Sequence, residues 1–222
     1  MRLLPLLLLP ALLVGCGRDR RGGGVDASRG DAGSPVAAAP LHWRMAPPHG
    51  ARLREGDTLQ VETGLHTVLW PAGQQPVQPP YTVRATLQKH AGRLHEGCGL
   101  IFGGSSLDGP EAGQSYSYFL VRGDGSFLIK RRVGAETPVV RGWTAHPSIR
   151  RDREDGGRPN DLVVHVGTQE VVFGINGVEV ARVPASELDV SGIPGVRVAH
   201  EVQLSVAGFT VTRRDSPGGG SR

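Results

Sequence analysis

Two pairs of acidic residues have the spacing that paired-carboxylate chemistry uses. Asp152 and Glu154 are two positions apart, and so are Glu187 and Asp189. Side chains two apart on a β-strand point to the same face, and retaining glycoside hydrolysis needs two carboxyl groups about 5 Å apart. The first pair lies in the charged run 150–157, which ends in two glycines, and the second follows a short helical turn. Both pairs are therefore predicted to be solvated surface residues, and no catalytic residue is predicted.

Metal-ligand residue types gather in one short segment. His90, His95, Glu96 and Cys98 follow one another closely, but their spacing matches neither a zinc finger nor the His-Glu-x-x-His helix. Glycines also interrupt the segment, so a polar loop is predicted, with no metal and no cofactor. Cys98 begins an apolar run and is predicted to be a buried, unreactive cysteine. The sequence also has no Gly-x-Ser-x-Gly motif and no phosphate-binding loop.

Sugar recognition makes simpler demands on a chain. It needs a flat aromatic side chain to stack on the sugar ring, with polar side chains nearby to meet the hydroxyl groups. Tyr116 and Tyr118 fall on one face of a predicted strand, Arg131 lies on the next strand, and Trp70 and Trp143 occur near strand ends. These five residues form the predicted ligand-binding set. Packing in the core or at a rim is the alternative for each of them.

Nearly all of the chain after residue 80 has the composition of β-strands. The predicted strands are 81–88, 115–122, 125–132, 161–166, 170–175, 178–183 and 201–212. Residues 122–126 are predicted to join two of them as a hairpin, and a change of phase at Gly208 predicts a β-bulge. Only 184–188 is predicted to form a helical turn. Many short strands predict an all-β domain, a sandwich or a barrel.

A second hairpin is predicted at 176–177, where Asn-Gly suits a type I′ turn because both residues tolerate a positive φ. Such a turn places Ile175 opposite Val178 and predicts that Phe173 lies opposite Val180 on the same face. One face of this hairpin is expected to be buried and the other solvated.

The order of these motifs resembles a known superfamily. In chain order the motifs are Gly97-Cys98-Gly99-Leu100-Ile101-Phe102, Tyr116-Ser117-Tyr118-Phe119-Leu120-Val121, Gly123-Asp124-Gly125, Trp143, Asn160-Asp161-Leu162, Val172-Phe173-Gly174-Ile175-Asn176-Gly177 and Gly192-Ile193-Pro194-Gly195-Val196. Over about 65–211 the chain is similar to the concanavalin A-like lectin/glucanase superfamily, especially the bacterial laminin-G-like and 3-keto-disaccharide hydrolase-like sandwiches. The resemblance implies a two-sheet antiparallel β-sandwich, a jelly roll whose concave sheet or rim loops commonly hold carbohydrate.

Members of that superfamily either hydrolyse glycosides or only bind them. A glycosidase among them is expected to show a Glu-x-Asp-x-Glu run on one strand, and this chain has none. The departure weighs against hydrolysis. Calcium bridges rim loops in parts of the superfamily, and Asp124 or Asp161 could supply oxygen ligands, but no calcium site is predicted.

The first sixteen residues resemble a bacterial lipoprotein signal peptide. Arg2 is followed by the apolar stretch 3–14, which is too short to span a bilayer, and then by Gly15 and Cys16. The resemblance implies cleavage after residue 15 and acylation of Cys16. A plain secretory signal or an apolar N-terminal segment is the alternative. Acylation would leave Cys98 without a partner for an internal disulfide, and three acyl chains would anchor the protein stably.

Composition suggests four parts: a signal peptide at 1–15, a lipidated flexible tether at 16–40, a β-sandwich domain at 41–214 and a disordered tail at 215–222. The residue after Cys16 is Gly17 and not Asp, so the resemblance favours the outer membrane. The net charge of +4 comes from arginines scattered among acidic residues, which argues against nucleic acid as a partner.

Three functions follow as hypotheses. The first is a membrane-anchored, non-catalytic envelope protein that binds a glycan or another surface polymer. The second is a glycoside or 3-keto-glycoside hydrolase of the same fold, whose acidic residues meet only in three dimensions. The third is a structural envelope protein that contacts another protein.

Overall fold

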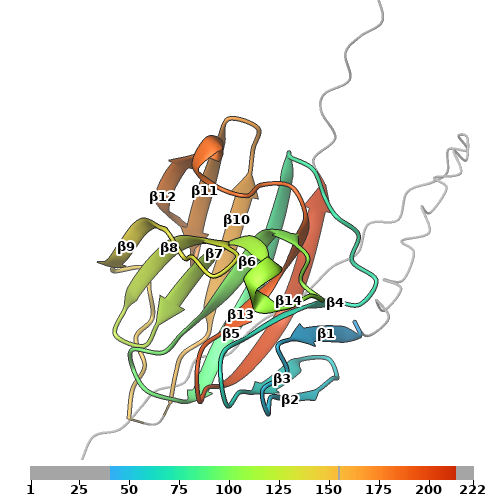
Figure 1. The fold of residues 1–222 in the computed structure, drawn as a ribbon. Helices are drawn as coiled ribbons and strands as arrows, with labels where there is room; N and C mark the ends of the chain where they lie inside the picture. The colour runs from blue at the N-terminus through green and yellow to red at the C-terminus, as the bar shows by residue number, and fades with distance from the viewer. Residues whose placement is uncertain (1–40, 155, 214–222) are drawn as a thin grey trace, which may run out of the picture. The chain divides into compact units, whose positions relative to one another are not determined.

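The computed structural model describes residues 41–154 and 156–213, which form a two-layered β-sandwich (Figure 1). The predicted signal peptide, with Cys16, the predicted tether and the predicted tail at 215–222 lie outside the described residues. In the described ranges the helices are two short 3₁₀ turns, η1 (Glu111–Gly113) and η2 (Ala185–Glu187), and none is long and apolar enough to cross a membrane.

Each layer is an antiparallel sheet of seven strands. The first sheet, in spatial order, consists of β1 (Trp43–Ala46), β4 (Thr67–Pro71), β13 (Ile193–Val198), β6 (Gly97–Ser105), β7 (Ser115–Arg122), β8 (Ser126–Val133) and β9 (Val139–Ala145). The second consists of β12 (Val178–Pro184), β11 (Glu170–Ile175), β10 (Asn160–Val166), β5 (Tyr81–Ala91), β14 (Gln203–Arg213), β3 (Leu59–Glu62) and β2 (Arg52–Arg54). The predicted all-β, two-sheet antiparallel sandwich is confirmed.

The core lies between the sheets and follows the period-2 alternation of the strands. In β5 the buried residues Tyr81, Val83, Ala85 and Leu87 alternate with outward-facing polar ones. Aromatic rings from both sheets meet at the centre, since the ring centroid of Phe173 on β11 lies 5.1 Å from that of Phe119 on β7.

The predicted turns are found, with one difference in register. Asn176 and Gly177 both have positive φ, and Gly208 lies at a break in the β14 register. The 122–126 hairpin and the turn at η2 also form as predicted. However, Phe173 lies opposite Ala181, and not Val180 as predicted, because a β-bulge after Phe173 shifts the β11–β12 register by one residue.

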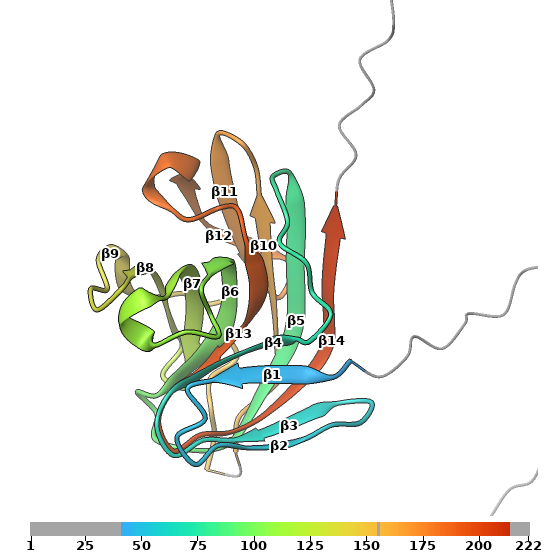
Figure 2. The ribbon, with the colours of Figure 1, turned by 45° about the vertical axis from the view of Figure 1, so that its right-hand side comes forward.

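A second apolar cluster lies on the other side of the first sheet, which we call the outer face of the β1–β9 sheet. Its members are Ala46, Val68, Trp70, Ile101, Leu107, Tyr116, Tyr118, Leu120 and Leu128. Leu107 belongs to the segment between β6 and β7, which lies beside those strands on the side away from the second sheet (Figure 2). One end of this outer face is thus covered by the chain itself.

Candidate functional site

A strip without side chains runs along β6 on the outer face of the β1–β9 sheet. Cys98 and Leu100 point into the core, so the neighbouring Gly97 and Gly99 face outward. In the ladder Gly97 pairs with Arg122 of β7, and Gly99 pairs with Arg197 of β13. We call Gly97 and Gly99 the glycine strip. Both glycines are buried, because Trp143 covers Gly97 and the backbone of β7 lies against Gly99, so the strip lets neighbouring groups pack closely on β6.

Trp143 of β9 extends over one end of the glycine strip. A Cβ atom on Gly97 would lie 3.1 Å from Cη2 of Trp143, so the indole reaches across β8 and β7 to β6. The guanidinium of Arg122 stacks on the indole, 4.3 Å from the ring centroid, and Nη2 of Arg122 lies 2.7 Å from Oδ2 of Asp124. Trp143 is 37% exposed. Among the tryptophan, tyrosine and phenylalanine residues within 41–154 and 156–213, it alone is exposed. It therefore offers a free aromatic surface beside fixed hydrogen-bond donors.

Arg197 lies on the other side of the glycine strip and is incompletely bonded. Its guanidinium carbon is 5.2 Å from the ring centroid of Tyr118. Nε and Nη1 of Arg197, together with Nε of Arg122, are buried nitrogen atoms without an acceptor, and no other buried side-chain nitrogen or oxygen of the described residues lacks a partner. A buried donor without an acceptor costs about 1–3 kcal/mol. All three atoms belong to arginines that flank the glycine strip.

The outer face of the β1–β9 sheet has more positive than negative charge. Five basic residues of its strands lie there: Arg44, Arg122, Lys130, Arg132 and Arg197. Three of them have carboxylate partners: Asp108 for Arg44 at 2.5 Å, Asp124 for Arg122 and Glu111 for Arg132 at 3.6 Å. Lys130 and Arg197 form no ion pair with any described residue. Lys130 lies directly opposite Tyr118 in the β7–β8 ladder, so Tyr118 separates the two unpaired cations.

Two histidines, His66 and His200, contact each other at the rim of the same face. Nε2 of His66 lies 2.6 Å from Oε1 of Glu111, and the His66 ring is 5.4 Å from that of His200. Burial lowers the pKa of His66, and the nearby charge of Arg197 lowers it further, while the hydrogen bond to Glu111 opposes both effects. Neutral His66 is thus favoured next to Arg197. The two histidines are far apart in the sequence, which held no signal for their contact.

The structure separates the five predicted ligand-binding residues. Trp70, Tyr116 and Tyr118 all lie on the outer face of the β1–β9 sheet but are buried in its apolar cluster. Trp143 lies on the same face and is exposed. Arg131 does not join them, because Arg132 and not Arg131 pairs with Tyr116, and neighbouring residues on a strand point to opposite faces.

Arg131 instead forms part of a structural network on the inward side of β8. Its Nε and Nη2 atoms donate to the two carboxylate oxygens of Asp189, at 2.8 and 2.9 Å. The Ser115 hydroxyl also donates to Asp189, whose backbone N–H donates to the hydroxyl of Ser117. Both carboxylate oxygens of Asp189 are bonded in this network, which indicates that Arg131 fastens the loop after η2.

The prediction that both carboxylate pairs are solvated is half wrong. Glu154 and Glu187 are exposed, but Asp152 and Asp189 are mostly buried and held by basic residues. Asp152 lies 2.6 Å from the Nζ atom of Lys89, at the end of the sandwich. Burial of each aspartate is possible because it gains a charged partner.

The segment with metal-ligand residue types does not form a ligand cluster. Cys98 is buried, and burial raises the pKa of its thiol to about 12, which agrees with the predicted unreactive cysteine. Glu96 lies 3.5 Å from His95 and 3.6 Å from His200, while His90 bonds to Ser205 on β14. Within the described ranges, no three His, Cys, Asp or Glu side chains converge as metal ligands.

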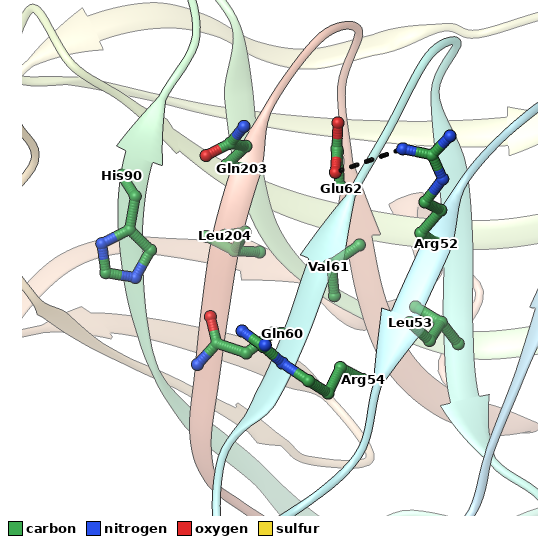
Figure 3. Close-up of a pocket in the computed structure, with 9 residues that line it drawn as sticks. All are labelled: Arg52, Leu53, Arg54, Gln60, Val61, Glu62, His90, Gln203 and Leu204. Atoms are coloured by element: carbon green, nitrogen blue, oxygen red, sulfur yellow. Dashed lines mark ion pairs between the residues drawn. The ribbon is translucent and has the colours of Figure 1, made fainter.

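A shallow groove of about 680 Å³ crosses the outward side of the other sheet (Figure 3). It lies over β2, β3, β14 and β5 and is lined mainly by polar residues, including His90, Glu62 and Gln203. A strand bearing Gln203 separates His90 from Glu62, and Glu62 points toward Arg52 instead (Figure 3). No tryptophan, tyrosine or phenylalanine lines the groove. It therefore lacks both a facing acid–base pair and a stacking surface for a sugar.

Comparison with known proteins identifies the fold and no family. No family model matches the chain, and no curated protein matches it. Among solved structures, the carbohydrate-binding module CBM66 from Bacillus subtilis has a TM-score of 0.59 at 10% identity, over 78% of this chain and 97% of that one. A protein of unknown function with a galectin-like fold from Bacillus subtilis has a TM-score of 0.56 at 15% identity, over 78% of this chain and 90% of that one.

The exoplasmic/lumenal domain of VIP36, in its Ca²⁺- and mannose-bound form, is also similar. Its TM-score is 0.57 at 10% identity, over 80% of this chain and 85% of that one. Identities this low establish a shared fold only. The chain thus has the β-sandwich of galectin-like, lectin and carbohydrate-binding-module proteins, as the resemblance in sequence implied.

Proposed function

We propose that this chain is a non-catalytic glycan-binding protein, with its site formed by Trp143, Arg122 and Arg197 on the outer face of the β1–β9 sheet. The observation on which the proposal rests is the exposed indole of Trp143 stacked on Arg122 above Gly97. An aromatic surface beside oriented polar donors suits a sugar ring, which has an apolar C–H face and a hydroxyl edge. The fold shared with carbohydrate-binding and lectin domains supports the same function.

Binding is favoured over hydrolysis by the state of the acidic residues near the site. Asp124 is held by Arg122 and by the backbone N–H of Ser126, and these bonds lower the pKa of its carboxyl group in spite of partial burial, which acts to raise it. Glu96 accepts a hydrogen bond from the backbone N–H of His200. Carboxylates engaged in this way suit a structural role better than proton transfer to a glycosidic oxygen, which needs an acid of raised pKa.

Trp143→Ala is expected to weaken glycan binding at least tenfold, because it removes the stacking surface. A glycan array with the folded domain would first select a ligand, and isothermal titration calorimetry would then compare the variants. Val178→Ala is the matched control, since Val178 is also an exposed apolar residue but lies on β12 of the other sheet, and it should leave the affinity unchanged. Equal binding by Trp143→Ala and the native protein would refute this site.

We also propose that the protein is anchored to the bacterial envelope through an acylated Cys16, with the outer membrane as its location. Support comes from the signal-like residues 1–16 and from the polar composition of 17–40. Cys16→Ser is expected to abolish incorporation of labelled palmitate and to move the protein out of the membrane fraction. Cys98→Ser is the control, because its buried thiol is not an acylation site, and it should retain the label. Unchanged labelling of Cys16→Ser would contradict the anchor.

A further inference from the structure

We infer that the ligand is an acidic glycan, and that Arg197 and Lys130 bind its carboxylate or sulfate group over Tyr118. The inference rests on the proposed glycan-binding function and adds the chemical class of the ligand. It comes from the charges on the outer face of the β1–β9 sheet, where these two cations have no ion-pair partner among the described residues.

The positions of the two cations allow them to share one anionic group. Arg197 is on β13 and Lys130 is on β8, with β6 and β7 between them. Strands in a sheet lie about 4.8 Å apart, so their Cα atoms are about 14 Å from each other. Both side chains are long and lie on the same face, and Gly99 places no side chain between Arg197 and β7. The head groups can therefore approach a common ligand from two sides.

Tyr118 fixes the floor between the two cations. Its ring is buried under Arg197 and lies 5.7 Å from the ring of Tyr116, so it cannot turn away. Nε and Nη1 of Arg197 are buried without a protein acceptor, so a ligand meets this partly exposed side chain through the remaining atoms of its guanidinium. Carboxylate and sulfate oxygens are strong acceptors for a guanidinium, and a charged acceptor forms stronger hydrogen bonds than a sugar hydroxyl. The site is thus better matched to an acidic sugar than to a neutral one.

The acidic residues around the two cations favour a ligand whose negative charge is confined to separate groups. Asp108, Glu111 and Asp124 lie on the same face and neutralise the other three arginines. A uniformly charged chain such as a nucleic acid would meet these carboxylates as well as the two free cations, and like charges repel. A glycan with separated carboxylate or sulfate groups avoids that repulsion.

The test compares three oligosaccharides of equal length by calorimetry: an oligogalacturonate, its carboxyl-reduced neutral counterpart, and a sulfated form of that neutral counterpart. At least one acidic probe is expected to bind tenfold or more tightly than the neutral one, and the difference should shrink in high salt. The stronger of the two acidic probes identifies the anionic group as carboxylate or sulfate.

Arg197→Gln and Lys130→Gln are each expected to reduce this preference at least threefold. Lys130 lies outside the site proposed for the neutral sugar ring, so Lys130→Gln should also leave the neutral probe's affinity unchanged. Arg182→Gln removes an equal charge from β12 on the other sheet and should have no effect. Thermal melting confirms that each variant is folded. If Arg197→Gln does not fold, Lys130→Gln alone tests the inference. Equal affinity for neutral and acidic probes, or a preference that both variants retain, overturns the inference and leaves glycan binding intact. An array on which no glycan binds refutes the proposed function itself.

Discussion

Lys89→Met is expected to lower the free energy of unfolding by about 3–5 kcal/mol, the cost of leaving a buried charge without its partner. The Nζ atom of Lys89 lies 2.6 Å from Oδ2 of Asp152 and donates to the backbone carbonyl of Arg93 at 3.0 Å. The side chains of Lys89 and Asp152 are only 6% and 12% exposed. Methionine fills the same volume but cannot neutralise Asp152. Urea denaturation, followed by fluorescence, measures the loss.

Two controls separate the charge effect from a general intolerance of this region. The double variant Lys89→Met/Asp152→Leu removes both charges and should recover much of the lost stability, because a buried ion pair can be replaced by apolar residues at little cost. Arg182→Ala breaks an ion pair with Glu179 in which both side chains are about half exposed, and it should change stability by less than 1 kcal/mol. A similar small loss for Lys89→Met would mean that Asp152 remains hydrated.

Local sequence patterns predicted the strands that have one wet face. β5, β10 and β11 each alternate or lie beside a strong turn, and the Asn-Gly hairpin follows from the φ preferences of two residues. β4 and β6 were not predicted, since they are buried on both faces and, unlike the similarly buried β7, do not lie beside a strong turn signal. β9 was missed for the opposite reason, because nearly all of its residues are exposed. Whether such segments form strands depends on their burial by segments that are distant in the sequence.

The candidate site could be predicted only in part, for the same reason. Trp143 was expected to bind ligand and does present an exposed ring, whereas Tyr116 and Tyr118, named as ligand-binding candidates with core packing as the alternative, are covered by the chain. The register of the 122–126 hairpin already indicates that Lys130 and Arg132, and not Arg131, share a face with the tyrosines. No local pattern could identify Arg197, because it reaches the site through the pairing of β13 with β6, about a hundred residues away in the sequence.

Asn160→Leu is expected to cost at least 3 kcal/mol of folding stability, because it removes a buried amide that makes four hydrogen bonds. Its Oδ1 atom accepts from the backbone N–H of Arg150 at 2.9 Å and from Nδ2 of Asn176 at 2.8 Å. Its Nδ2 atom donates to the carbonyls of Arg150 and Arg158. Leucine is of similar size but satisfies none of these groups, and each polar group left buried and unpaired costs about 1–3 kcal/mol.

Two further variants resolve which bonds matter. Asn160→Asp keeps both acceptor bonds but places a buried carboxylate oxygen against the carbonyls of Arg150 and Arg158, so it should be strongly destabilising at neutral pH if the two donor bonds matter. Asn176→Gly keeps the positive φ that the hairpin turn needs but loses the bonds of Asn176 to Asn160 and to the Ser148 carbonyl. Its destabilisation therefore reports on the link between the hairpin and the 146–160 segment, and not on the turn. If Asn176→Gly and Asn160→Leu both lose less than 1 kcal/mol in urea denaturation, the two asparagines do not fasten that segment to the sandwich.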